Sequence, residues 1–97
     1  MAKVRVIARA MARDGKADEL KAQLLKMVKP TRAEDGCIYY ELFESNIPGL
    51  FYYNELWQSQ AHLDAHAASK HFTEIIGKGI QELVREPLEV SFLQEVQ

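Results

Sequence analysis

The sequence has one cysteine, Cys37, and no long hydrophobic segment. A single cysteine can form neither a disulfide within the chain nor a cysteine metal cluster. The longest apolar runs fall far short of the roughly 20 residues that a membrane-spanning helix requires. The first residues, Met1-Ala2-Lys3, lead directly into an alternating segment and not into the hydrophobic stretch of a signal peptide. We therefore expect a cytoplasmic protein that does not contact a membrane.

A strong charge of either sign is also missing. The chain has 12 Lys and Arg residues against 14 Asp and Glu residues, a formal net charge of −2. Such a balance gives no electrostatic attraction for nucleic acid. No Gly-x-Gly-x-x-Gly or Walker-type loop follows a predicted strand, and Gly77-Lys78-Gly79 falls inside a helical pattern. A nucleotide site is therefore not expected.

Four segments have the period-two alternation of β-strands, and two have the spacing of amphipathic helices. The expected strands are Lys3 to Arg13, Cys37 to Glu44, Leu50 to Trp57 and Leu88 to Val96. We expect the first helix to begin near Ala17, to be interrupted near Pro30 and to stop at Asp35-Gly36. We expect the second between Ser59 and Pro87, with Ser69 able to restart or cap a second helical piece and with a bend or break at Gly77 and Gly79. This β-α-β-β-α-β order in one domain, residues 1–97, predicts an α+β fold, the ferredoxin-like sandwich.

Two helices can cover only one face of a four-stranded sheet, yet the predicted hairpin has aromatic residues on both faces. They are Tyr39, Phe43, Phe51, Tyr53 and Trp57 at odd positions, and Tyr40 and Tyr52 at even positions. Exposed aromatic surface of this extent favours association, and a chain this short buries only a limited fraction of its surface. We therefore expect a second copy to cover the open face in a two-fold homodimer.

The segment from Tyr53 to Phe72 has the densest set of chemically capable side chains. Tyr53, Glu55 and Trp57 share one face of a strand, so the two rings could form the wall of a pocket for an aromatic molecule. They could equally be ordinary core aromatics. A carboxylate at position 55 is at least half buried and needs a partner or a proton. Arg5 or Arg9 on the first strand could be that partner in a structural ion pair, or Glu55 could orient a histidine or hydrogen-bond a substrate hydroxyl.

Three histidines follow this strand. His66 and His71 are the best candidates for a proton-transfer group, because an unperturbed imidazole titrates near neutral pH. His62 and His66 are four residues apart, a spacing that can hold a metal on one helix face. No third ligand is identifiable, so we expect no metal. His62 is more simply explained as a surface or capping residue.

The first strand has a row of arginines on one face. Arg9 and its neighbours could attract an anionic or phenolate substrate, or they could pair with glutamates across strands. The residues concerned are Arg5, Arg9 and Arg13, with Glu41, Glu44 and Glu55 as the acidic partners.

Two stretches resemble a known family. Glu55-Leu56-Trp57, then His66, then Ser69-Lys70-His71-Phe72 resembles the antibiotic-biosynthesis monooxygenase domain family, which includes small quinol monooxygenases. The segment from Thr31 to Tyr40 resembles the other signature of the family, at the end of the first helix and the start of the second strand.

The resemblance implies a dimeric α+β barrel in which two sheets face each other. It also implies a cofactor-independent monooxygenase that oxidises a quinol or polyphenolic aromatic with O2. In that chemistry the deprotonated substrate itself reacts with dioxygen. The protein would supply His66 or His71 as the base, Trp57 and Tyr53 as the wall and Glu55 as the orienting group.

Other activities remain open within the resemblance. A related branch degrades haem with an asparagine on the first strand and a later helical histidine. This chain has no asparagine on the first strand and has Ile76 where those relatives have the histidine, so no haem is expected. Some relatives isomerise small phosphorylated sugars. From a different class, the chain could be a small dimeric ligand-binding or stress-response module without turnover.

Overall fold

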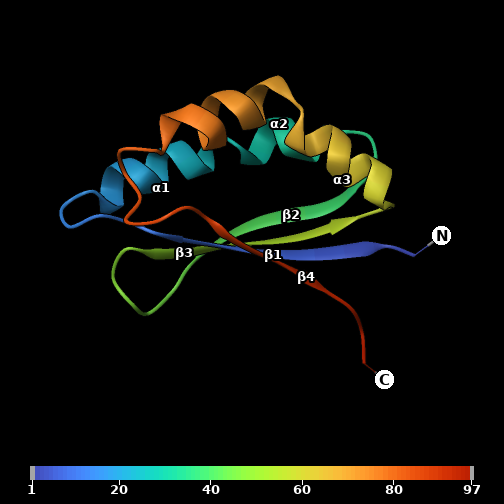
Figure 1. Ribbon diagram of the computed structural model, residues 1–97, viewed down its shortest axis with the longest axis horizontal. Helices are drawn as coiled ribbons and strands as arrows, with labels where there is room; N and C mark the ends of the chain where they lie inside the picture. Colours follow the sequence, from blue (N-terminus) through green and yellow to red (C-terminus); the bar gives the residue numbers. More distant parts are fainter. Residues whose placement is uncertain (1, 97) are drawn as a thin grey trace.

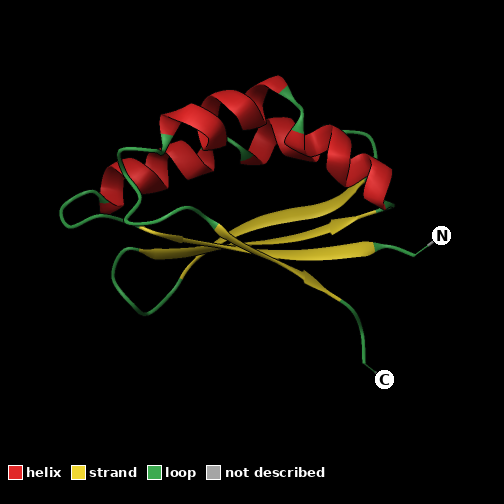
Figure 2. Ribbon diagram, in the orientation of Figure 1, coloured by secondary structure: helices red, strands yellow, loops and turns green. Residues whose placement is uncertain are grey.

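The computed structural model describes residues 2–96 and has two layers, a four-stranded antiparallel sheet with the helices on one of its faces (Figures 1 and 2). The elements are β1 (Val4–Met11), α1 (Ala17–Leu25), α2 (Val28–Arg32), β2 (Cys37–Glu44), β3 (Leu50–Trp57), α3 (Gln60–Ala67), η1 (Phe72–Gly79) and β4 (Glu89–Leu93). The strands lie in the order β2-β3-β1-β4. The predicted ferredoxin-like α+β architecture is confirmed.

The first helical segment is broken where the sequence predicts. α1 ends at Leu25, α2 begins at Val28, and Pro30 is the third residue of α2. Proline has no N–H to donate to the carbonyl of Lys26 four residues earlier, and its ring crowds that turn. The chain therefore turns at Lys26 and Met27 before the helix resumes.

The second helical segment divides near Ser69, whose hydroxyl accepts from the backbone N–H of Phe72, as expected, but it has a π-helix where a bend or break at the glycines is predicted. Ser59 caps α3 by accepting a hydrogen bond from the backbone N–H of His62, as expected. After α3 the chain forms η1, a π-helix that includes Gly77 and Gly79. The wider turn of a π-helix, with bonds between residues five apart, takes the place of a bend. The backbone N–H of Ile80 donates to the carbonyl of Ile75 at 3.0 Å in this manner.

The two faces of the sheet have different surroundings. On β1 and β3, Val6 lies opposite Glu55 and Ala8 lies opposite Tyr53, and opposite residues project to the same side. We call this side, which packs beneath the helices, the covered face. The small side chains of Ala8 and Ala10 let the helices approach closely, and both residues are buried. The other side is called the uncovered face.

The register of the hairpin determines from which face of the sheet each of its aromatic residues projects. Tyr40 on β2 lies opposite Glu55, and Phe43 lies opposite Tyr52. Tyr40 therefore shares the covered face with Tyr53, although one position is even and the other odd. The prediction of aromatics on both faces is confirmed, but position parity alone does not assign them to a face.

The last strand is shorter than predicted and little covered. β4 comprises Glu89–Leu93 in place of the expected Leu88 to Val96, and all of its residues are exposed. Val90 and Phe92 lie opposite Ala8 and Val6, so they project to the covered side beyond the reach of the helices. In Figure 1 the chain leaves the sheet after β4. No helix within residues 2–96 has the length and apolar character to cross a membrane.

Candidate active site

A cavity of about 460 Å³ lies between the covered face and the helices α3 and η1. Its walls are mainly apolar and come from all four strands, with Phe72 and Ile76 closing the helical side and Val90 and Phe92 at the edge. The chemically capable residues in the wall are Tyr40, Tyr53, Asp64, Glu55 and His66. A largely apolar cavity with a few polar groups is the usual form of a small-molecule site.

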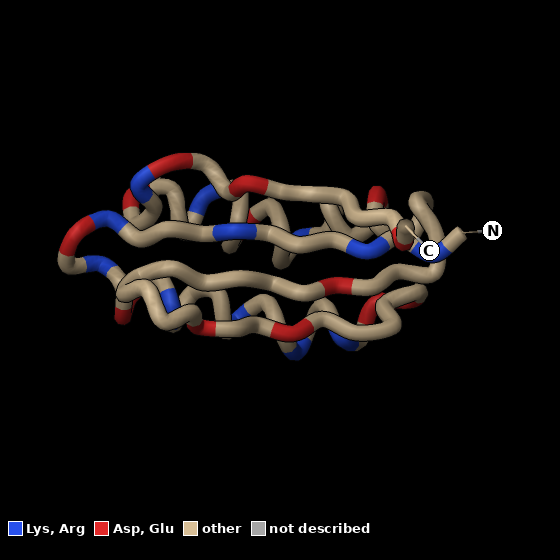
Figure 3. The backbone as a smooth tube through the Cα atoms, turned by 90° about the horizontal axis from the view of Figure 1, so that it is seen from below, with Lys and Arg blue, Asp and Glu red and all other residues tan. Residues whose placement is uncertain are grey.

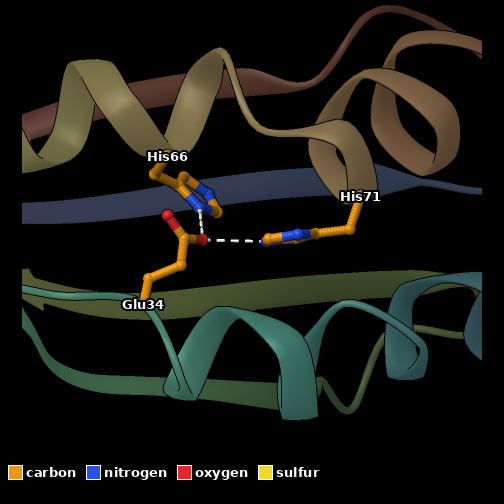
Figure 4. Close-up of side chains that lie close together, drawn as sticks. All are labelled: Glu34, His66 and His71. Atoms are coloured by element: carbon orange, nitrogen blue, oxygen red, sulfur yellow. Dashed lines mark hydrogen bonds and ion pairs between the residues drawn. The ribbon is translucent and has the colours of Figure 1, made fainter.

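Glu34 joins the two histidines that the sequence singles out. Its Oε2 atom lies 2.7 Å from His66 Nδ1 and 2.8 Å from His71 Nε2 (Figure 4). Glu34 comes from the turn between α2 and β2, His66 from α3 and His71 from the start of η1. The three side chains are 15%, 3% and 21% exposed, respectively. The fold thus encloses a carboxylate between two imidazoles.

His66 is the one member of this group in the cavity wall. An ionised Glu34 accepts hydrogen bonds only, so the Nδ1 atom of His66 carries the proton and Nε2 is left with its lone pair. The ring is held between Trp57 and Phe72, at centroid distances of 4.7 and 5.2 Å. Burial lowers the pKa of His66, while the hydrogen bond and charge of Glu34 oppose that shift. The arrangement favours a neutral imidazole with one free nitrogen.

Glu55 is the buried carboxyl group of the cavity, with 4% of its surface exposed. Its Oε1 atom accepts a hydrogen bond from the indole N–H of Trp57 at 3.0 Å. Burial raises the pKa of Glu55 to about 7, although the bond from Trp57 acts in the opposite direction. Near neutral pH this group therefore exists both as an acid and as a carboxylate.

The expected ion pair between Glu55 and Arg5 or Arg9 is wrong. Arg5 lies opposite Leu56 and Arg9 opposite Tyr52, so both arginines project to the uncovered face. Arg5 donates a hydrogen bond to the hydroxyl of Tyr39 on that face. Arg9, which the sequence suggests as a substrate contact, is not part of the cavity wall.

The expected cross-strand pairing of the arginine row is not found either. Among the ion pairs within residues 2–96, Arg5, Arg9 and Arg13 form none with a glutamate, and Glu44 pairs with Lys21 at 3.0 Å. The side chain of Glu41 accepts instead from Asn54 at 3.4 Å.

The two predicted aromatic wall residues have different positions. Tyr53 is in the cavity wall, stacked on Tyr40 at a centroid distance of 4.7 Å, and its hydroxyl donates to the carbonyl of Leu24. Trp57 is fully buried and lies behind His66, outside the wall. Its indole therefore holds Glu55 in place through a hydrogen bond and His66 through a ring contact, without itself lining the cavity.

His62 has a structural role, as the sequence indicates. Its Nδ1 atom is 2.8 Å from the hydroxyl of Ser59, and its Nε2 atom is 3.5 Å from Asp35. A side chain at Gly36 would collide with the imidazole, since a Cβ atom there would be 2.2 Å from the ring. The left-handed conformation of Gly36, with φ of +82°, also favours glycine. His62 therefore belongs to the packing at the start of α3.

Sequence reasoning missed Glu34 and Tyr40 as site residues. Both lie in the segment from Thr31 to Tyr40 that carries the second family signature, which was the only available signal. Glu34 follows a helix and belongs to no periodic pattern, so nothing in its neighbourhood predicts contact with His66 and His71.

Residues 3–78 match the family described as antibiotic biosynthesis monooxygenase. The chain is 40% identical over 90 residues to "Putative monooxygenase Rv0793" of Mycobacterium tuberculosis, which covers 93% of this chain and 88% of that protein. The structure of Rv0793 superposes with a TM-score of 0.91 at 38% identity, covering 99% of this chain and 97% of that one. PA3566 from Pseudomonas aeruginosa is similar, with a TM-score of 0.91 at 30% identity over 100% of this chain and 97% of its own.

Proposed function

Because this chain belongs to the antibiotic biosynthesis monooxygenase family, we propose that it is a monooxygenase that oxidises a quinol or polyphenolic aromatic with O2 and without a cofactor. The observation that carries the proposal is His66, a buried imidazole in the wall of an apolar cavity with its Nδ1 atom held by Glu34. Such a group is suited to remove a proton from a bound hydroxyl.

The reaction needs no reductant other than the substrate. Loss of a hydroxyl proton gives an electron-rich anion, which passes one electron to O2, and the two radicals combine to form a carbon–oxygen bond. Cleavage of the O–O bond leaves one oxygen atom on the substrate and releases the other as water. For a hydroquinone the balance is quinol plus O2 to hydroxyquinone plus H2O, so the substrate supplies all of the electrons.

Each side chain has a defined task in this scheme. His66 Nε2 accepts the hydroxyl proton, and the carboxylate of Glu34 stabilises the imidazolium that forms. Glu55, in its protonated form, donates a hydrogen bond to the negative charge that develops on oxygen. Tyr53 and the apolar wall exclude water, which strengthens both interactions.

The size and lining of the cavity support an aromatic substrate of one or two fused rings. Ligand cavities for compounds of this size are usually about 300–1,000 Å³, and this one is about 460 Å³. The rings of Tyr40, Tyr53 and Phe72 offer flat surfaces for stacking. Asp64 at the wall adds negative charge, which favours a neutral quinol over an anion on entry.

We also propose that the protein works as a two-fold homodimer formed through the uncovered face. Phe43 and Leu93, which are 50% and 46% exposed, project there beside Tyr52. The strand register puts Arg5 and Arg9 on this face together with Glu41 and Glu89, so the face has no single sign of charge that would repel a second copy. Seen from that side, the basic positions lie on one strand and acidic positions lie on the strands beside it (Figure 3). An apolar face with mixed charges fits a self-complementary interface.

Oxygen uptake with a panel of reduced naphthoquinols and benzoquinols tests the activity. We expect faster uptake than in buffer and, with 18O2, one labelled oxygen atom in the organic product. Simple autoxidation would instead give the unlabelled quinone and hydrogen peroxide, which added catalase would reveal by returning oxygen. Uptake no faster than in buffer for every compound, together with saturable quinol binding, would identify a binding module and reject the proposed reaction.

A further inference from the structure

Glu34, His66 and His71 also form a set of metal-ligating groups. We propose that these residues bind a first-row divalent cation such as Zn²⁺, and that the bound ion prevents His66 from acting as a base. The sequence suggests only the pair His62 and His66, which the structure separates by placing His62 against Gly36. The set formed in the fold is a different one.

The donor atoms converge closely enough for one ion. Glu34 Oε2, His66 Nδ1 and His71 Nε2 all lie within 4.8 Å of one another. With metal–ligand distances of about 2.0–2.2 Å, tetrahedral ligands are about 3.4 Å apart. The two oxygen–nitrogen distances, 2.7 and 2.8 Å, would therefore have to open by about 0.7 and 0.6 Å. Side-chain rotation can supply a change of this size.

The chemistry of the donors and their exposure also suit such an ion. Two imidazoles and one carboxylate are ligands that zinc and neighbouring metals accept. His71 and Glu34 are 21% and 15% exposed, so an ion can reach the set from solvent and water can complete its coordination. Ser69 supports the set, because its hydroxyl lies 3.3 Å from His71 Nε2 and donates to the carbonyl of His66.

The ion would lie outside the substrate cavity. Of the three ligands only His66 is in the cavity wall, and its ligating nitrogen is the one that faces Glu34. An ion at that nitrogen would lie between His66 and two residues that are not in the cavity wall, Glu34 and His71, so we expect it not to contact the substrate or the O2 beside it. Its effect on the reaction passes through the imidazole.

That effect is a change of tautomer. Without metal, the Nδ1 atom of His66 carries the proton and Nε2 can accept another. A metal on Nδ1 needs the lone pair of that atom, so the proton of the neutral ring moves to Nε2. His66 then presents a donor to the cavity and cannot take a proton from a quinol. This second half of the proposal rests on the proposed function, whereas the metal site itself does not.

Titration with Co²⁺, followed by its visible absorption, and calorimetry with Zn²⁺ test the site without any turnover. We expect one ion per chain and binding at least about 10-fold weaker in His71→Ala and in Glu34→Gln, since even outer-shell changes weaken metal sites by that factor. His62→Ala is the matched control on the same helix and should bind as the wild type does. Absence of saturable binding, or equal binding by all four proteins, would overturn the site.

NMR of ¹⁵N-labelled histidine tests the switch independently of activity. We expect the proton of His66 to move from Nδ1 to Nε2 on addition of Zn²⁺, and quinol oxidation to fall in parallel. An unchanged tautomer, or a zinc-loaded protein that oxidises quinol at the metal-free rate, would overturn the switch. If no quinol is oxidised under any condition, the proposed function fails while the cobalt titration and the NMR spectrum still decide the metal proposal.

Discussion

The covered and uncovered faces of the sheet are built from the same strands but hold their polar groups in different ways. On the covered face, Glu55 and His66 are 4% and 3% exposed. On the uncovered face, Arg5, Arg9 and Glu41 are only partly buried and lie among aromatic side chains. Burial raises the pKa of Glu55 to about 7 and lowers that of His66, so the carboxyl group can hold a proton while the imidazole stays neutral. The helices thus bury the titratable groups of one face of the sheet and leave the polar groups of the other face partly exposed.

The largest expected difference between the faces is in catalysis. His66→Ala removes the proposed base, and we expect quinol oxidation to fall by about 100-fold or more, in the range usual for general bases. His62→Ala removes an imidazole from the same helix, outside the cavity, and should stay within about threefold of the wild type. Initial rates of oxygen uptake measure both. Equal losses in the two variants would mean that the cavity is not the site of the reaction.

The buried carboxyl group predicts a second difference, in stability against pH. Glu55 keeps its proton up to a pH of about 7 in the folded protein, against an ordinary value of 4.5. The folded state therefore binds more protons than the unfolded state between these values, and the free energy of unfolding falls as the pH rises through this window. The loss is complete above pH 7 and is on the order of 3 kcal/mol. The adjacent hydroxyls of Tyr40 and Tyr53 stay neutral there, because burial raises the pKa of both.

Glu55→Gln should remove this penalty and still accept the hydrogen bond from Trp57. We expect urea unfolding at pH 8 to show a variant more stable than the wild type, and the two to differ little at pH 4.5. Glu41→Gln on the uncovered face is the matched control, and the decline of stability with pH should persist in it. A wild-type protein whose stability does not fall between pH 5 and 8 would contradict the prediction.

The third prediction concerns kcat, which we expect to fall by an intermediate amount when the charge of Glu34 is removed. Glu34→Gln keeps the shape of the side chain and an oxygen that can accept from His66, but it removes the negative charge opposite the imidazolium. Hydrogen bonds to charged groups contribute about 1.5–3 kcal/mol, so kcat should fall by about 10–100-fold. KM should change little, because the substrate does not contact this residue. A rise in KM with kcat unchanged would place Glu34 in substrate binding instead.

Sequence patterns predicted the architecture because alternation and helical spacing record which side chains are buried. The strands, the break before Pro30 and the cap at Ser59 all follow from local rules. Alternation within a strand does not tell how two strands align, and for this reason the pairing of Glu55 with an arginine was wrong. The π-helix was not predicted, because the spacing of apolar residues in this segment does not distinguish its hydrogen bonds between residues five apart from those of an α-helix.

The site was only partly predictable for a related reason. His66, Glu55 and Tyr53 lie in one continuous segment whose spacing places them on one strand face and the following helix. Glu34 reaches them from the turn before β2, and this contact depends on how α2 packs on the sheet. Contacts made only by tertiary packing need the three-dimensional structure.

The uncovered face predicts a fourth effect, on assembly. Phe43→Glu places a charge in the proposed interface, and we expect the dissociation constant of the dimer to rise by at least about 10-fold. Ile47→Glu is the control, since Ile47 is equally exposed at 50% but lies in the loop between β2 and β3. Light scattering across a concentration series measures both. A monomeric wild type would reject the dimer, and a Phe43→Glu variant that dimerises as the wild type does would place the interface elsewhere.

The smallest effect is expected at Arg9, and it separates the two faces most directly. The first strand puts its arginines on the side opposite the cavity, so Arg9→Ala should change KM for a quinol by less than about twofold, the usual limit for a distant site. Measured at concentrations where the dimer is intact, a larger rise in KM would mean that substrate also contacts the uncovered face. The cavity beneath the helices would then be incomplete in one chain, and the second copy would have to bring its sheet to the substrate.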